Sequence, residues 1–228
     1  MKLSVIIPVY NEEKTVKEII NKVKSVNLDI EKEIIIVDDS SKDSTRDILK
    51  KIKDDSIKVY YHEKNKGKGA AVRTGLNNSS GEIIVIQDAD LEYNPKEYPL
   101  LLDPILNGKE KVVYGSRFKG RILGDLILSH YYGNKLLTLV TRILYLHGVS
   151  DMETCYKMFR REVLDGINLK AKRFDFEPEI TAKIIKKGYN IYEVPITYHM
   201  RSFKEGKKIH WTDGIKALYY LVKYRFVN

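Results

Sequence analysis

The chain has 228 residues, of which 43% are hydrophobic and 31% charged. That apolar fraction is enough for a buried core and excludes a disordered chain, and a single cysteine, Cys155, excludes a disulfide scaffold. The 40 Lys and Arg exceed the 31 Asp and Glu, giving a net charge of +9. This positive charge favours binding to a polyanion, an acidic membrane surface or a phosphorylated substrate, without choosing among them. A high Lys and Glu content is also typical of proteins from organisms that grow at high temperature.

No segment has the pattern of a signal peptide or a membrane span. The apolar run at 3–10 is too short for a signal core and is followed at once by acids. The longest apolar region, 122–149, is interrupted by charged and polar residues, so it falls short of the ~18–20 apolar residues of a spanning helix. We therefore expect a cytoplasmic protein.

Strand and helix patterns alternate through the first half of the chain. The apolar runs are short, β-branched and continuous, as in strands buried on both faces, and lie at 3–9, 33–37, 57–61, 82–86 and 111–114. Helices are expected at 12–26, with Asn11 as N-cap, and at 42–53, 68–78 and 95–107. The repeat predicts an α/β fold with a mostly parallel central sheet and flanking helices.

The second half has a different pattern. It predicts strands at 154–160 and 190–196, and helices over 123–147, 177–188 and 211–226. The mixed apolar and basic content of 122–149 suits a helix lying on a lipid surface, although packing in the core is the alternative. Because no linker or repeat interrupts the chain, we expect one domain over 1–228.

The predicted strand ends carry polar clusters. Ligands of α/β sheets bind outside the carboxyl ends of the strands, which here are followed by Pro8–Glu12, Val37–Ser40, Gln87–Asp90 and Gly115–Arg117. The glycine fingerprints of dinucleotide enzymes and P-loop NTPases are absent from the sequence. The basic run Lys66–Gly69 opens a helix, so it either approaches a phosphate or forms a solvated loop.

The triplet Asp88-Ala89-Asp90 follows a buried strand directly. Two carboxylates at i and i+2 can hold Mg²⁺ or Mn²⁺, which prefer oxygen ligands and keep phosphates as co-ligands. The position at a strand end favours metal binding over a simple polar turn. Asp38 and Asp39 either belong to the same site or cap the next helix.

These segments together carry a resemblance to a known family. The segments are Ser4–Glu12, Ile36–Ser41, Asn65–Ala70, Gln87–Leu91, Gly115–Arg117, Asp151–Lys157, Glu193–Ile196 and Arg201–Lys207. In that order they resemble glycosyltransferase family 2, and within it the polyprenyl- and dolichyl-phosphate hexose synthases. The resemblance implies the GT-A fold and a nucleotide-sugar donor.

The resemblance also implies donor-site roles. The positions that match the family's nucleotide-sugar contacts are Pro8, Tyr10, Glu12, Val37, Asp39, Asp88, Ala89 and Asp90. Among them Asp39 accepts from a ring N–H of the base, and Asp90 is the metal ligand. Glu92 stands where the mannosyl-phosphate synthases often carry Gln as second metal ligand, and its carboxylate oxygen would serve as well.

The acceptor side is expected to be cationic. A lipid phosphate is already ionised near neutrality, so it needs cations to approach an anionic diphosphate more than it needs a base. Arg117, Arg201 and Lys207 match the family's phosphate-facing positions, with a solvated basic surface as the alternative. The basic segment from Met200 to Trp211 is interpreted as an active-site loop that closes over the donor.

Other candidate residues are open to two interpretations. In family members that act on sugar hydroxyls, an acid in the region of Asp151 and Glu153 is the catalytic base. In the phosphate-acceptor synthases, the acid in this region positions basic residues or the donor sugar. The alternative to both roles is that Asp151 and Glu153 only cap a turn before the next strand. Glu177 is interpreted as favourable to a helix dipole, although relatives carry a pocket residue there. Cys155 is interpreted as packing, and the histidines lack zinc-ligand spacing.

The leading hypothesis is an inverting hexosyltransferase that uses Mg²⁺ or Mn²⁺. It moves mannose or glucose from GDP-mannose or UDP-glucose to polyprenyl or dolichyl phosphate, at the cytoplasmic face of a membrane. Residues 1–117 form the donor half and 118–228 the acceptor half. One alternative transfers to a sugar hydroxyl and needs Asp151, Glu153 or Glu177 as base. A nucleic-acid-binding protein is disfavoured because the basic residues form no stripe along the sequence. A catalytically inactive scaffold is also disfavoured, because carboxylates grouped at one edge of the sheet repel each other unless a cation lies between them.

Overall fold

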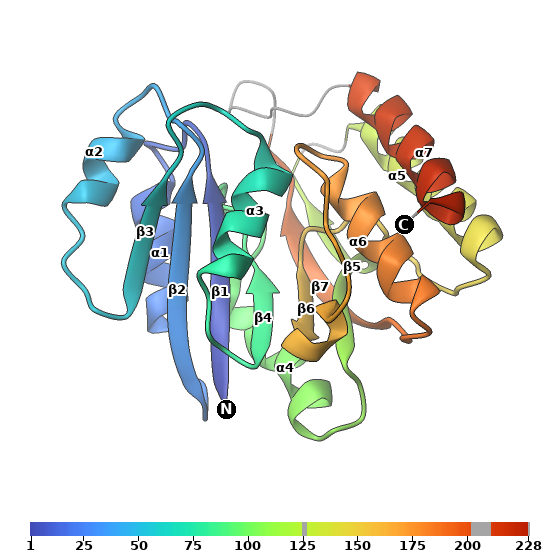
Figure 1. Cartoon of the computed structure of the whole chain (residues 1–228), viewed down its shortest axis with the longest axis horizontal. Helices are drawn as coiled ribbons and strands as arrows, with labels where there is room; N and C mark the ends of the chain where they lie inside the picture. The colour runs from blue at the N-terminus through green and yellow to red at the C-terminus, as the bar shows by residue number, and fades with distance from the viewer. Residues whose placement is uncertain (125–126, 202–210, 228) are drawn as a thin grey trace.

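The computed structural model describes residues 1–124, 127–201 and 211–227. Its strands form one seven-stranded sheet in the order β3-β2-β1-β4-β6-β5-β7. Among the described strands, only β6 runs antiparallel to its neighbours, since β4 and β5 both pair with it in that sense while the remaining pairs are parallel. The predicted α/β fold with a mostly parallel sheet is therefore confirmed (Figure 1).

The first half supplies four parallel strands and the helices between them. The strands are β1 (Lys2–Val9), β2 (Glu31–Asp38), β3 (Ile57–Tyr61) and β4 (Ile83–Ile86). The helices are α1 (Val16–Ser25), α2 (Thr45–Lys50), α3 (Lys68–Asn77) and α4 (Tyr98–Leu106), with a 3₁₀ turn η1 (Pro95–Glu97) before α4. All four residues of β4 are buried, as its continuous apolar run predicts for a central strand.

The second half completes the sheet and adds three helices. The strands are β5 (Val112–Leu123), β6 (Lys157–Arg160) and β7 (Tyr192–His199). The helices are α5 (Leu128–Tyr145), α6 (Phe176–Lys186) and α7 (Trp211–Phe226), with a 3₁₀ turn η2 (Arg161–Leu164) after β6. Side chains of α1 and α4 pack on one face of the sheet, and side chains of α3, α5, α6 and α7 pack on the other.

Several predicted boundaries are wrong, and two of them have an identifiable cause in the structure. Asn11 is not an N-cap: it has a left-handed φ of 50°, and α1 begins only at Val16, after a turn in which the carbonyl of Glu12 accepts from two backbone amides. The strand predicted at 111–114 continues to Leu123 because it pairs with β7 again beyond an irregularity between Ser116 and Arg121. The helical region predicted at 123–147 is consequently one helix, α5.

Candidate active site at the carboxyl edge of the sheet

The carboxyl ends of β1, β2 and β4 meet at one edge of the sheet, as predicted. The loops after β1 and β2 bind each other: the amide of Asn11 donates to Ser41 Oγ at 2.9 Å, and the amide of Glu12 donates to Thr45 Oγ1 at 2.8 Å. The loop after β4 carries Asp88 to Glu92 beside them. Charged side chains from distant parts of the sequence therefore gather at this edge.

Arg201 joins three carboxylates of this edge. Its guanidinium lies 3.0 Å from Asp90 Oδ2, 3.4 Å from Glu12 Oε2 and 3.7 Å from Glu92 Oε1. Its backbone amide also donates to Glu92 Oε1 at 3.0 Å. Within the described ranges no three acidic, His or Cys side chains converge as a metal-ligand set, and the Arg201 guanidinium lies among the carboxylates of this edge.

The electrostatics at Asp90 indicate a deficit of positive charge. Burial, together with the nearby carboxylates of Glu92 and Asp88, raises the pKa of Asp90 from 3.8 to about 8, and Arg201 compensates only in part. Hard carboxylate oxygens that cannot all ionise comfortably are a donor set suited to Mg²⁺ or Mn²⁺. The residues at this edge therefore fit a divalent cation.

Lys68 connects the Asp-x-Asp triplet to α6, a link that the sequence did not predict. Its Nζ lies 2.8 Å from Asp88 Oδ1, 2.9 Å from Glu177 Oε1 and 2.9 Å from Cys155 Sγ. Burial alone would lower the pKa of Lys68, but the two carboxylates raise it well above its ordinary value, so the ammonium stays charged. Lys68 is thus neither solvated nor free for a phosphate in this conformation, and both Glu177 and Cys155 belong to the site.

Arg117 and Asp151 form a buried ion pair. The guanidinium donates to both carboxylate oxygens, at 2.8 Å and 2.7 Å, and the Arg117 amide adds a third bond at 2.9 Å. Glu193 accepts from the amide of Asp151 at 3.0 Å and so fixes the turn that carries it. The Arg117 guanidinium also lies 5.1 Å from the centre of the Tyr198 ring, whose hydroxyl donates to Glu92 at 2.5 Å.

This chain of contacts ties the two cationic positions together. It runs from Arg201 through Glu92 and Tyr198 to Arg117 and ends at Asp151. Sequence reasoning identified both arginines but missed Tyr198, because a strand tyrosine has no pattern that separates it from packing. The third predicted cation, Lys207, lies outside the described residues.

The predicted donor-site residues divide into exposed and buried groups. Asp39 is buried and supports the next loop: it accepts from the amides of Lys66 at 2.8 Å and Gly67 at 2.7 Å, and lies 2.7 Å from His62 Nδ1. The side chains of Val37 and Ala89 pack in the core, and the contact of these two residues with the donor stays a prediction. Pro8, Tyr10 and Glu12 are partly exposed at the edge, where a ligand can reach them.

Glu153 is a half-buried acid behind the Arg117–Asp151 pair. Its Oε1 is buried and has no hydrogen-bond partner among the described residues. Burial, and then the carboxylate of Glu177, raises the pKa of Glu153 from 4.5 to about 8. Burial therefore favours the protonated form of Glu153.

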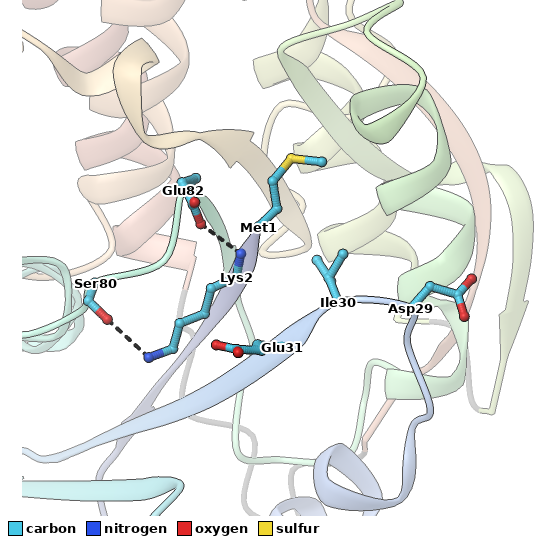
Figure 2. A pocket seen from close by; sticks show the side chains of 7 residues that line it. All are labelled: Met1, Lys2, Asp29, Ile30, Glu31, Ser80 and Glu82. Atoms are coloured by element: carbon cyan, nitrogen blue, oxygen red, sulfur yellow. Dashed lines mark hydrogen bonds between the residues drawn. The ribbon is translucent and has the colours of Figure 1, made fainter.

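A separate groove opens at the opposite edge of the sheet (Figure 2). It measures about 500 Å³ and is lined by Met1, Lys2, Asp29, Ile30, Glu31, Ser80 and Glu82. Lys2 crosses it, donating from its amide to Glu82 at 2.6 Å and from Nζ to Ser80 at 3.1 Å. Since α/β sheets bind their ligands at the carboxyl edge, this groove is not the candidate active site.

An acidic Asp-x-Asp edge beside fixed arginines, on a sheet of this topology, defines a glycosyltransferase of the GT-A fold. Residues 4–167 match the model of glycosyl transferase family 2, and the chain belongs to that family. The predicted family membership and GT-A fold are confirmed.

Two curated relatives cover almost the whole chain. It is 31% identical to "Dolichol-phosphate mannosyltransferase" of Pyrococcus furiosus over 98% of its own length, and spans 64% of that longer protein. It is 32% identical to "UDP-N-acetylglucosamine--dolichyl-phosphate N-acetylglucosaminyltransferase" of Methanococcus voltae, covering 95% of this chain and 93% of the relative. Among solved structures, the chain is similar to glucosyl-3-phosphoglycerate synthase from Mycobacterium tuberculosis, which was solved in complex with Mn²⁺, UDP and phosphoglyceric acid. The two structures superpose with a TM-score of 0.77 at 21% sequence identity, and the match covers 100% of this chain and 79% of the synthase.

Proposed function

We propose that the protein is an inverting glycosyltransferase that moves one sugar from a nucleotide-diphosphate sugar to dolichyl or polyprenyl phosphate. Both curated relatives described above carry names that specify dolichyl phosphate and a single sugar. Their sugars differ, mannose in one and N-acetylglucosamine in the other, so GDP-mannose, UDP-glucose and UDP-N-acetylglucosamine are all candidate donors.

The observation that carries the proposal is the side-by-side arrangement of an acidic and a cationic site at one edge. Asp88 and Asp90 supply carboxylates, while Arg201 and Arg117 lie on either side of Tyr198 and Glu92. A transfer between two phosphorylated molecules brings anions together, and fixed guanidinium groups compensate that repulsion. The arrangement suits a phosphate acceptor.

A divalent cation fits the acidic part of this edge. Asp90 and Glu92 would hold it, with Asp88 kept in place by Lys68. When bound, Mg²⁺ or Mn²⁺ supplies positive charge that stabilises the diphosphate leaving group. Arg201, which contacts the same carboxylates, then has its guanidinium available to an acceptor phosphate.

The buried pair Arg117–Asp151 argues against a general base at Asp151. Both oxygens of the carboxylate accept from Arg117, and the side chain has no exposed surface. A lipid phosphate is already an anion at neutral pH and needs no base, so this arrangement favours a phosphate over a hydroxyl acceptor. Asp151 acts as a positioning residue, holding Arg117 toward the edge.

An exposed apolar face supports contact with a membrane. The helices α5 and α7 pack together and leave a row of large apolar side chains exposed, namely Leu128, Tyr132, Leu136, Leu139, Ile143, Ile215, Tyr219, Val222 and Phe226. Large apolar side chains exposed together on packed helices are typical of protein or membrane contact sites. Of the two alternatives for 122–149, core or lipid, α5 has features of both: Leu137, Thr138, Thr141 and Tyr145 are buried on its other side.

None of the described helices combines the length and the hydrophobicity that crossing a bilayer requires. We propose peripheral attachment on the ground of the exposed apolar face of α5 and α7. The cytoplasmic location and the division into donor and acceptor halves stay predictions.

A donor panel tests the proposal. Purified protein with Mg²⁺ or Mn²⁺ and a short polyprenyl phosphate is given each radiolabelled donor, and label is then extracted into organic solvent. We expect one donor to label the lipid phase, and the same polyprenol without phosphate to remain unlabelled. Asp90→Asn should abolish transfer, whereas Asp47→Asn, at a side chain 74% exposed on α2, should not.

Two results would contradict the proposal. Transfer that persists in EDTA would exclude the metal. A donor that binds with metal but labels no lipid phosphate would indicate a hydroxyl acceptor, and Glu153 would then be the next residue to replace.

A further inference from the structure

A basic groove of about 890 Å³ lies between α3, the loop before α6, and α7. Residues 64–66, residues 170–175 and α7 each contribute at least two Lys or Arg to its lining, while the acids among its described lining residues are Asp175 and Asp213. We call this feature the basic groove. The proposed transfer reaction does not use it.

The two acids of the basic groove leave most of its positive charge unbalanced. The Asp175 carboxylate accepts from the backbone amides of Arg173 at 2.7 Å and Lys172 at 3.4 Å, so it is held by the main chain of its own loop. Asp213 pairs with Lys216 at 3.3 Å. Across the described part of the chain, the side chains of Lys66, Lys172 and Arg173 form no ion pair, and all three are exposed.

The backbone that carries these cations is fixed. The amides of Gly69 and Ala70, in the first turn of α3, donate to the carbonyls of Arg173 at 3.2 Å and Lys172 at 3.1 Å. A side chain at Gly67, whose φ is +92°, would meet the carbonyl oxygen of Lys172 at 2.3 Å. The two basic loops are therefore held together by their backbones, with their cations close to each other.

Helix α7 joins the basic groove to the exposed apolar face. Its buried residues, Ala217, Leu221 and Tyr224, fix its orientation against the body of the protein. Lys216 and Lys223 then line the groove, whereas the apolar residues of α7 named above face outward. A surface that buries the apolar side of α7 will lie beside the groove.

We propose that the basic groove binds the phosphate headgroups of acidic phospholipids, so that α7 holds the protein on an anionic bilayer. This inference rests on the membrane attachment put forward in the proposed function. The neighbouring apolar face favours a bilayer over a nucleic acid, which would cover the cations and leave the apolar side chains in water. The headgroups supply anions and the acyl region supplies the apolar partner.

Vesicle sedimentation tests this inference. The full chain is mixed with vesicles of phosphatidylcholine alone or with added phosphatidylglycerol, at two salt concentrations. We expect tighter binding to the acidic vesicles, weakened by salt. The double variant Lys172→Ala/Arg173→Ala should bind acidic vesicles roughly 25-fold more weakly, about 5-fold for each cation lost near an anionic surface, and bind neutral vesicles as before.

A matched variant controls for net charge. Lys50→Ala/Lys51→Ala removes the same charge from the end of α2, at the far end of the sheet from α7, and should bind acidic vesicles like the parent (Figure 1). Both double variants should melt at the parent temperature and transfer sugar to a short polyprenyl phosphate in detergent at the parent rate.

The outcomes separate the two proposals. Equal binding of the parent to neutral and acidic vesicles, or equal weakening by both double variants, would overturn the groove while leaving transfer intact. Thermal stabilisation by soluble glycerol phosphate without preference for acidic vesicles would assign the groove to a free phosphorylated ligand instead, and preference for an oligonucleotide would assign it to nucleic acid. Groove-dependent vesicle binding without transfer from any donor would overturn the proposed function alone.

Discussion

Replacing Asp151 by Asn tests whether this residue is a positioning residue or a base. Asp151 is completely buried and Arg117 is 8% exposed, so the substitution leaves a buried guanidinium without its counter-charge. Breaking a buried pair in this way costs about 3–5 kcal/mol. At about 2–4 °C per kcal/mol for a chain of this size, the melting temperature should fall by about 6–20 °C.

Thermal and urea unfolding of the variant measure this loss. The matched control is Glu18→Gln in the pair that Glu18 forms with Lys22 at 2.8 Å, whose side chains are 55% and 46% exposed. An exposed pair of this kind contributes about 0–1 kcal/mol, so the control should melt within a few degrees of the parent. If Asp151→Asn keeps the parent stability but loses turnover, the positioning role is refuted and Asp151 is a base toward the acceptor.

Three further substitutions test the remaining contacts of the site. Asp90→Asn should weaken Mn²⁺ binding in calorimetry, yet leave the metal-free protein no less stable, because burial and neighbouring acids already raise the pKa of Asp90 to about 8; a large loss of metal-free stability would contradict this. Lys68→Met should raise the donor's Kd and lower the melting temperature, because it leaves Asp88 and Glu177 without their shared cation; an unchanged Kd would exclude a positioning role. The pKa of Glu153 in the folded protein lies near 8, above its ordinary value of 4.5, so the stability that its protonated form contributes is present below pH 4.5 and is lost as pH rises through 8. Glu153→Gln should therefore flatten the dependence of the melting temperature on pH between pH 4.5 and 8. An unchanged pH dependence would contradict the raised pKa.

The strands of the first half were predictable because burial on both faces leaves a strong signal. Continuous β-branched runs placed β1 to β4 within one or two residues of their observed bounds. The start of α1 was not predictable in the same way. A polar Asn before two acids is typical of an N-cap, but the amide of Asn11 binds Ser41, 30 residues away, and holds the chain in a left-handed turn instead. Long-range partners of this kind have no local pattern.

The candidate site was predicted in outline for a similar reason. Polar residues directly after buried strands must lie at the carboxyl edge, so Asp88, Asp90 and Arg117 were identified. The roles of Lys68 and Glu177 were missed because each is locally unremarkable: one is a lysine in a flexible run, the other an acid in the first turn of a helix. Only the packing of α3 beside α6 brings them within 2.9 Å of each other.

Arg201 explains how this edge stays folded with its carboxylates close together. Grouped carboxylates repel each other, and burial increases that repulsion, unless a cation lies among them. In the described conformation Arg201 is that cation, in contact with Glu12, Asp90 and Glu92. Asp90 and Glu92 would hold Mg²⁺ or Mn²⁺, and with the positive charge of that ion supplied there, the Arg201 guanidinium would be free to turn toward a phosphate. Under the proposed function, donor and acceptor binding would then be coupled through Arg201, while Arg117 stays held by Asp151 in either case.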